Sequence, residues 1–176
     1  MTLFATLSRF FRHVLFSTNA PIVATLVVIR RCNLSCTYCS EYDKVSQPVP
    51  LAVMKERVAA LANLKTLIVS CTGGEPLLHP DLAEIIKEIR RHGMVATLIT
   101  NGYFLNRQCI EELNEAGLYL LQVSIDNTVS DEVSAKSLKV LDRKLQLLAD
   151  HARFKVNINS VLGISDERTL DAITIA

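Results

Sequence analysis

Three closely spaced cysteines are the residues in this sequence best suited to carry chemistry. Cys32, Cys36 and Cys39 follow the apolar run Ile22 to Ile29 at spacings of four and three residues. A loop with this spacing can fold around one iron–sulfur cluster, but it supplies three thiolates where a four-iron cluster has four irons. One iron is then open to a ligand, which is typical of a reactive metal centre.

The elements that must position these cysteines can be read from the hydrophobic periodicity. From Pro21 onward, short β-rich runs alternate with segments of helical period, which predicts an α/β fold with a parallel sheet. The expected strands are Ile22 to Ile29, Thr66 to Ser70, Val95 to Thr100, Tyr119 to Ile125 and Lys155 to Leu162. The expected helices are Leu51 to Leu64, Asp81 to His92, Arg107 to Ala116 and Ser137 to His151. Gly93 and Gly117 follow two helices, where a left-handed cap residue is expected.

Glycine-rich and polar motifs come at, or just after, the ends of the predicted strands. Gly73 and Gly74 permit unusual backbone angles and let backbone groups approach a ligand, and Glu75 adds an anionic acceptor. Thr100 and Ser124 end the third and fourth strands with hydroxyls that can donate and accept hydrogen bonds. Ligands bind at this edge in parallel α/β folds, so a shared site is expected, with a plain surface turn as the alternative for the glycine pair.

Two of these motifs resemble those of a known enzyme family. The segment Cys32-Asn33-Leu34-Ser35-Cys36-Thr37-Tyr38-Cys39 resembles the cluster loop of the radical S-adenosylmethionine enzymes, and Gly73 to Pro76 resembles their GGEP motif. The resemblance covers roughly Val23 to Leu162 and implies a [4Fe–4S] cluster on the three cysteines, with S-adenosylmethionine at its open iron. It further implies that an electron from the reduced cluster cleaves this cofactor to a 5′-deoxyadenosyl radical.

The same resemblance implies which residues hold the cofactor. Tyr38, the aromatic residue before the third cysteine, is expected to pack near the adenine, with ordinary loop packing as its alternative. Glu75 is expected to bind the cofactor's amino group. The full expected set of cofactor-binding residues is Tyr38, Gly73, Gly74, Glu75, Thr100 and Ser124.

Further polar residues near these motifs have two interpretations each. A capping or turn role competes with cofactor contact for Asn101 and Asp126. Many relatives have glycine after the Ser-x-Asp triplet, whereas this chain has Asn127, so the local loop geometry is open. Along the fifth strand, either Asn157 and Asn159 or the apolar residues between them face the barrel interior.

The expected fold is a partial parallel (β/α) barrel, truncated after its fifth strand. Residues 21–176 form its core domain, which is incomplete at the C-terminus. Residues 1–20 read as an N-terminal cationic amphipathic helix that packs on the domain or, through residues 1–16, docks on a membrane surface. This stretch is too short to span a bilayer, which needs roughly 20 apolar residues.

Composition restricts the partners and the compartment. The chain has 176 residues, 49% of them hydrophobic, and a formal charge of +1, so nothing in the balance calls for nucleic acid. Its five cysteines are odd in number and partly clustered, and no convincing signal peptide precedes them, which favours a reducing cytoplasm over secretion. The location expected is cytoplasmic, with peripheral contact at the inner face of the membrane through residues 1–16.

The resemblance also implies partners. These are a small-molecule, lipid or peptide substrate and a reducing partner such as flavodoxin or ferredoxin. The N-terminal helix and the Phe154 to Leu162 strand are similar to the hopanoid-pathway adenosyltransferase, and the motif order is equally similar to the molybdopterin-pathway cyclase.

A non-enzymatic alternative is a zinc- or iron–sulfur-binding module. Zinc would need a fourth ligand from Cys71, Cys109 or a histidine, whereas both cysteines read as small core residues. The histidines His13, His79, His92 and His151 read as surface residues.

Overall fold

The computed structural model describes residues 20–161 as a five-stranded parallel sheet whose strands lie side by side in chain order. The strands are β1 (Val23–Ile29), β2 (Ile68–Gly73), β3 (Val95–Thr100), β4 (Leu120–Ser124) and β5 (Lys155–Asn159). The helices are α2 (Leu51–Asn63), α3 (Leu82–Arg91), α4 (Arg107–Ala116) and α5 (Leu138–His151), with a short 3₁₀ helix, η1 (Pro76–Leu78). The predicted helix at residues 1–16 lies outside the described residues. The predicted α/β parallel sheet is confirmed.

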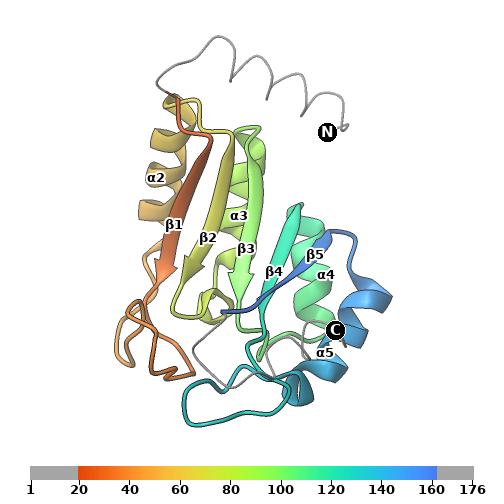
Figure 1. Cartoon of the computed structure of the whole chain (residues 1–176). Coiled ribbons are helices and arrows are strands. Elements are labelled where there is room, and N and C mark those ends of the chain that lie inside the picture. Colours follow the sequence, from red (N-terminus) through yellow and green to blue (C-terminus); the bar gives the residue numbers. More distant parts are fainter. Residues whose placement is uncertain (1–19, 162–176) are drawn as a thin grey trace.

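One face of the sheet packs on the helices, which lie behind it in Figure 1. Strand register aligns Leu26, Cys71, Leu98 and Leu121 in one buried row that belongs to the same core as Met54 of α2 and Ile85 of α3. Side chains alternate along a strand, so the neighbouring row, which runs through Thr25, Ser70 and Thr97, faces away from the helices. The helices therefore cover only the apolar face of the sheet.

Most predicted boundaries agree with the structure to within two residues. β5 ends at Asn159, three residues before the predicted end at Leu162, which lies outside the described residues, and β2 is the other exception. The sequence places this strand at Thr66 to Ser70, but the ladder with β1 continues through Cys71 and Thr72 to Gly73. The strand is therefore paired with its neighbour past the point where its apolar run ends. Gly93 and Gly117 have φ values of 75° and 79°, which confirms the predicted left-handed caps.

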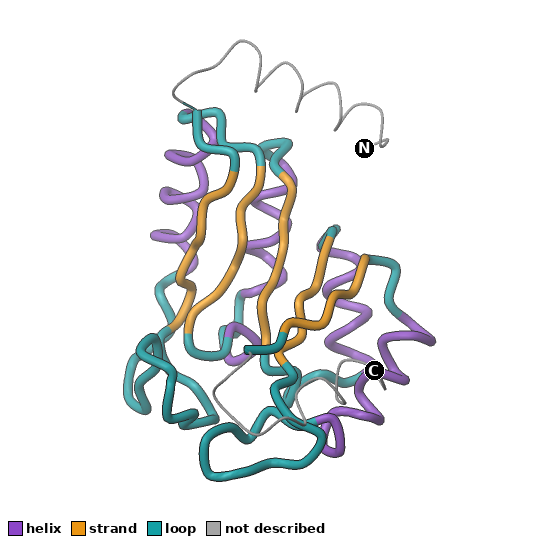
Figure 2. Tube along the Cα trace, in the orientation of Figure 1, coloured by secondary structure: helices purple, strands orange, loops and turns teal. Residues whose placement is uncertain are grey.

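Because all strands run in the same direction, their carboxyl ends share one edge of the sheet. In Figure 1 this is the lower edge, to which the arrowheads point. Figure 2 shows that the long loops gather there, including the segment after β1 that carries the three cysteines and the segment after β4. We call residues 30–44 the cysteine loop and residues 125–137 the β4–α5 loop. Within residues 20–161, no helix has the length and apolar character needed to cross a membrane.

Candidate functional site

A cavity opens at the carboxyl edge of the sheet, between the cysteine loop and the ends of three strands. Its lining includes all three loop cysteines and four of the six residues predicted to bind cofactor. The lining residues are Cys32, Leu34, Cys36, Cys39, Tyr42, Thr72, Gly73, Gly74, Ile99, Thr100, Asn101, Ser124 and Lys136. The sequence motifs therefore meet in space as their positions at the strand ends predict.

The cysteine loop folds back on itself through hydrogen bonds between its two ends. The backbone N–H of Cys32 donates to Asp43 O at 3.0 Å, and the N–H of Asp43 donates to Arg30 O at 3.0 Å. The Lys44 ammonium donates to the carbonyls of Cys32 (3.1 Å) and Leu34 (2.7 Å). These contacts give a loop without helix or strand structure a defined path, because each one satisfies a backbone group that regular structure would otherwise pair.

The two glycines of the GGEP motif are required by the close approach of β2 to β1. A Cβ added to Gly73 would lie 1.9 Å from Ile29 O, and one added to Gly74 would lie 2.2 Å from Arg30 O. At this approach the N–H of Gly74 donates to Ile29 O at 2.8 Å. Because they have no side chains, the two glycines allow the backbone at the start of the cysteine loop to approach β2. Both glycines also line the cavity.

Glu75 is fully buried and is not part of the cavity lining. Its Oε1 accepts hydrogen bonds from the Thr100 hydroxyl (2.7 Å) and from the N–H of Leu77 (3.0 Å). Its Oε2 accepts from the N–H of Asn101 at 2.8 Å. Burial raises the pKa of Glu75, while these three donors oppose the rise. The carboxyl group therefore ties the end of β3 to the turn after β2.

The three thiols make few contacts of their own. Cys32 Sγ accepts from the N–H of Leu34 at 3.4 Å and from the Asn101 amide at 3.7 Å. Burial raises the pKa of the Cys32 thiol. Within residues 20–161, no three His, Cys, Asp or Glu side chains are arranged to hold a metal ion as they stand. Ligation by the three cysteines therefore remains a prediction that rests on their shared cavity.

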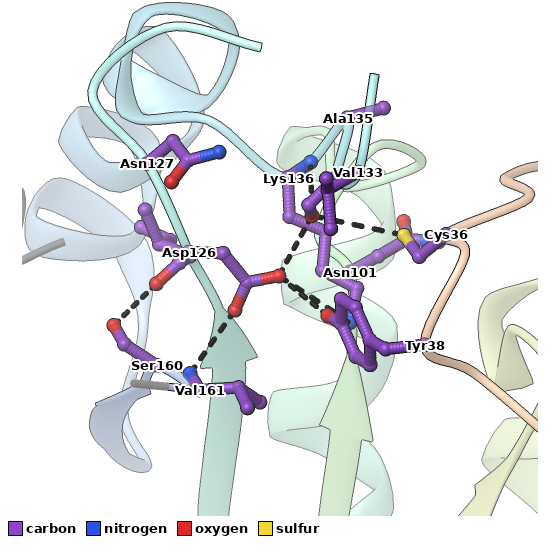
Figure 3. A network of polar contacts seen from close by, with 12 residues as sticks. Cys36, Tyr38, Asn101, Asp126, Asn127, Val133, Ala135, Lys136, Ser160 and Val161 are labelled. Atoms are coloured by element: carbon purple, nitrogen blue, oxygen red, sulfur yellow. Dashed lines mark hydrogen bonds and ion pairs between the residues drawn. The ribbon is translucent and has the colours of Figure 1, made fainter. Parts of the chain in front are cut away.

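Tyr38 lies in a polar network between the cysteine loop and the β4–α5 loop (Figure 3). Its hydroxyl donates to Asp126 Oδ2 at 2.5 Å and accepts from the Lys136 ammonium at 2.8 Å. Burial, followed by the hydrogen bond to Asp126, raises the pKa of Tyr38. Sequence reasoning gave Asp126 a capping role as its alternative and missed Lys136, which lies in an aperiodic segment and offers no signal.

Thr100 and Ser124 differ in how far their hydroxyls are already used. Thr100 Oγ1 donates to Glu75 and accepts from the N–H of Gly102 at 3.0 Å. No hydrogen bond from the described residues reaches the Ser124 hydroxyl, which lines the cavity. Register pairs Asn157 with Gln122 and Asn159 with Ser124, so both asparagines lie on the sheet face opposite the helices. Of Thr100 and Ser124, Ser124 is therefore the residue whose hydroxyl is more available to a ligand.

The loop that follows the Ser-x-Asp triplet does not need the glycine found in many relatives. Among the described non-glycine residues, only Lys65 has a positive φ, so Asn127 adopts ordinary backbone angles. Its side-chain amide donates to Asp131 Oδ2 at 2.7 Å. Asparagine therefore fits this loop without strain.

Neither of the remaining cysteines lines the cavity. Cys71 is fully buried in the core, where burial raises its pKa to about 12, and Cys109 lies on α4 with a pKa raised by burial to about 11. The surface interpretation of His79 is wrong. This residue is 4% exposed, with Nε2 2.8 Å from Val49 O and Nδ1 accepting from the N–H of Asp81. None of these three side chains offers the fourth ligand that a zinc site needs.

Comparison with known proteins identifies the family. The profile of the Radical SAM superfamily matches residues 26–174, so this chain belongs to the radical SAM superfamily. Enzymes of this family use a [4Fe–4S] cluster and S-adenosylmethionine. The GTP 3′,8-cyclase of Aquifex aeolicus is 35% identical over 159 residues, which are 80% of this chain and 48% of the cyclase. The PqqA peptide cyclase of Bradyrhizobium diazoefficiens is 32% identical over 120 residues, 65% of this chain and 32% of that enzyme.

Solved structures show the same fold at low sequence identity. Streptococcus suis SuiB, crystallised with its precursor peptide SuiA, matches with a TM-score of 0.71 at 18% identity over 97% of this chain and 39% of SuiB. This likeness confirms the predicted partial barrel. The chain thus spans half or less of the length of each of these three proteins.

Proposed function

We propose that this chain is the cluster- and cofactor-binding core of a radical S-adenosylmethionine enzyme. In this proposal Cys32, Cys36 and Cys39 hold a [4Fe–4S] cluster. The cluster supplies one electron that breaks a carbon–sulfur bond of S-adenosylmethionine, giving methionine and a 5′-deoxyadenosyl radical that modifies the substrate. The observation that carries the proposal is that three thiols from one loop share a cavity with the polar ends of β2, β3 and β4.

The composition of the cavity fits a cluster with one open iron. Thiolates are soft ligands that suit iron–sulfur clusters and zinc, and a structural zinc needs four protein ligands. Among the described residues, only the three loop cysteines bring sulfur to the cavity lining, and no histidine, aspartate or glutamate joins them there. The described residues thus leave a fourth position, which in this proposal is taken by S-adenosylmethionine.

The strand ends offer groups that suit the amino acid portion and the ribose of the cofactor. The Ser124 hydroxyl is open to a ligand as far as the described residues show, and Gly73 and Gly74 line the same cavity. Glu75 is hydrogen-bonded to Thr100 and Asn101, which line the cavity, and a cationic amino group bound near it would favour its ionised form. Asn157 and Asn159 extend this polar face along β5 and are proposed to contact cofactor or substrate.

The test is electron paramagnetic resonance of the anaerobically reconstituted, reduced chain, recorded with and without S-adenosylmethionine. We expect a four-iron signal that changes on addition of the cofactor. Cys36→Ala should lose the signal, whereas Cys109→Ser, which removes a thiol outside the cavity, should retain it. A signal that ignores the cofactor, or one that survives Cys36→Ala, would contradict the proposal.

The proposed reducing partner is an acidic electron carrier such as flavodoxin or ferredoxin. Arg30 and Lys44 are exposed at the base of the cysteine loop, and the Arg30 guanidinium lies 4.0 Å from Glu41. Opposite charge steers association and makes its rate depend on salt. Reduction by flavodoxin should therefore be slower in Arg30→Ala than in the control Arg153→Ala, and equal rates would argue against this surface.

The substrate is proposed only as a class, which is a small molecule, a lipid or a peptide. Residues 1–16 carry apolar side chains at helical spacing with Arg9, Arg12 and His13, which supports peripheral contact with a membrane. Five unpaired cysteines support a reducing cytoplasm, at the inner face of that membrane. Pelleting with anionic phosphatidylglycerol vesicles should retain the full chain more than a variant lacking residues 1–16, and equal retention would exclude membrane contact through this segment.

A further inference from the structure

Asp126 is the centre of the polar network that joins the two loops bordering the cavity. The residue is fully buried, and Figure 3 shows that its carboxylate reaches side chains from both loops. Its Oδ2 accepts from the Tyr38 hydroxyl at 2.5 Å and from the Ser134 hydroxyl at 2.7 Å. Its Oδ1 accepts from the N–H of Val161 at 3.2 Å. A buried carboxylate with this many donors holds its surroundings firmly, because removing any partner leaves buried polar atoms unpaired.

In each loop, a residue that donates a hydrogen bond to Asp126 is also a neighbour of a cysteine, either in the sequence or in space. Tyr38 directly precedes Cys39 in the sequence. On the other loop, Ser134 Oγ lies 3.7 Å from Cys36 Sγ. The N–H of Thr37 also donates to Val133 O at 3.1 Å. Asp126 thus reaches two of the three cysteines through one intervening residue each.

The directions of these hydrogen bonds follow from the donors available. The Lys136 ammonium has only donors, so the Tyr38 oxygen accepts from it and gives its single hydrogen to Asp126. Ser134 also has one hydrogen, which it donates to Asp126, while its oxygen accepts from the N–H of Lys136 at 3.2 Å. The contact with Cys36 is then a thiol donating to the Ser134 oxygen. Asp126 therefore keeps the Ser134 hydrogen away from the Cys36 sulfur.

We propose that Asp126 is a positioning residue that fastens the cysteine loop to the β4–α5 loop and sets the hydrogen bonding at Cys36. The first part concerns the metal-free chain alone. The second rests on the proposed function, because it applies to Cys36 as a cluster ligand. Hydrogen bonds to ligand sulfurs are among the features that set the potential of an iron–sulfur cluster.

The first test is hydrogen exchange of the metal-free full chain. Losing one buried hydrogen bond should raise amide exchange in residues 32–39 about tenfold in Asp126→Asn and in Tyr38→Phe. The double variant should exchange no faster than Asp126→Asn, because both changes remove the same link. Ser160→Ala is the matched control, since it removes a nearby hydrogen bond to Ile125 O that does not reach the cysteine loop. Unchanged exchange in residues 32–39, or additive effects, would overturn the fastening role.

The second test is the reduction potential of the reconstituted cluster, followed by electron paramagnetic resonance. Asparagine is a neutral and weaker acceptor, so in Asp126→Asn the Ser134 hydrogen should turn to the Cys36 thiolate and make the potential more positive. Adding Ser134→Ala should reverse that shift. A potential that does not move, or that stays shifted in the double variant, would refute this part. If the wild-type chain forms no cluster, the proposed function fails, while hydrogen exchange still decides the fastening role.

Discussion

Replacing Gly74 with alanine should separate the start of the cysteine loop from β2. The added Cβ would lie 2.2 Å from Arg30 O and 2.5 Å from Arg31 O, and both of these are backbone atoms that cannot rotate away. Relief of this overlap requires the strand ends to move apart. That movement breaks the hydrogen bonds from the N–H of Gly74 to Ile29 O (2.8 Å) and from the N–H of Glu75 to Arg31 O (3.0 Å).

The expected loss of stability can be estimated from these contacts. Two backbone hydrogen bonds contribute about 0.5–1.5 kcal/mol each, and residual overpacking adds about 1–3 kcal/mol. Gly74→Ala should therefore lower the unfolding free energy by about 2–6 kcal/mol, a large share of the roughly 5–15 kcal/mol that is usual for a domain.

Gly117→Ala is the control for this substitution. Gly117 has a φ of 79°, but a Cβ there would meet only the Arg90 side chain, at 3.5 Å. The left-handed backbone costs about 1–2 kcal/mol, part of which is offset by reduced freedom of the unfolded chain. Urea denaturation of the metal-free chain measures both variants. If Gly74→Ala is no more destabilised than Gly117→Ala, the close approach does not explain the glycine, and a role confined to ligand binding would be the better account.

Three further predictions concern titration, the cluster and thiol reactivity. Burial raises the pKa of Glu75 in the folded state above its usual value of 4.5. The folded state therefore binds this proton more tightly than the unfolded state, and the contribution of the carboxyl group to stability falls as the pH rises from 4.5 through the folded pKa. The stability of the wild type relative to Glu75→Gln should fall over that range in urea titrations, and a rise would mean that its three donors outweigh burial. Asn101→Leu removes the amide that donates to Cys32 Sγ, so the reconstituted cluster should have a more negative reduction potential than that of the wild type. An unchanged potential would mean that this hydrogen bond does not persist in the cluster-loaded protein. Burial raises the pKa of Cys71 to about 12, so this thiol should stay unlabelled by iodoacetamide at pH 8 until the chain unfolds, as measured by mass spectrometry. Labelling of the folded chain would contradict the place of Cys71 in the core.

The strands and caps could be predicted because they depend on local patterns. Alternating apolar runs and helical periods locate all five strands, and Gly93 and Gly117 mark helix ends by the left-handed angles that glycine permits. The end of β2 could not be predicted in this way. Cys71 and Thr72 extend the strand because β1 pairs with them, and a pairing partner more than forty residues away leaves no local signal.

The candidate site was predicted where it depends on strand ends and missed where it depends on contacts between loops. Gly73, Gly74, Thr100 and Ser124 line the cavity because parallel strands bring their carboxyl ends to one edge. Tyr38 instead reaches Asp126, 88 positions along the chain, and Lys136 joins them from a loop with no periodicity. Such contacts depend on how two irregular segments pack, which neither propensity nor spacing encodes.

The cysteine loop is held at the end of each strand that borders the cavity, and this has a consequence for its chemistry. Gly74 brings it to β2, Asn101 of the β3 end donates to Asn33 at 2.8 Å, and Asp126 after β4 holds Tyr38. The loop has no regular structure of its own, so its shape depends on the register of the sheet. In the proposed function the three cysteines of this loop would hold the cluster in the cavity that Ser124 also lines, where no hydrogen bond from the described residues reaches the Ser124 hydroxyl. The position of the reactive site would then depend on the pairing of β1 with β2 and on the ends of β3 and β4, in addition to the spacing of the cysteines.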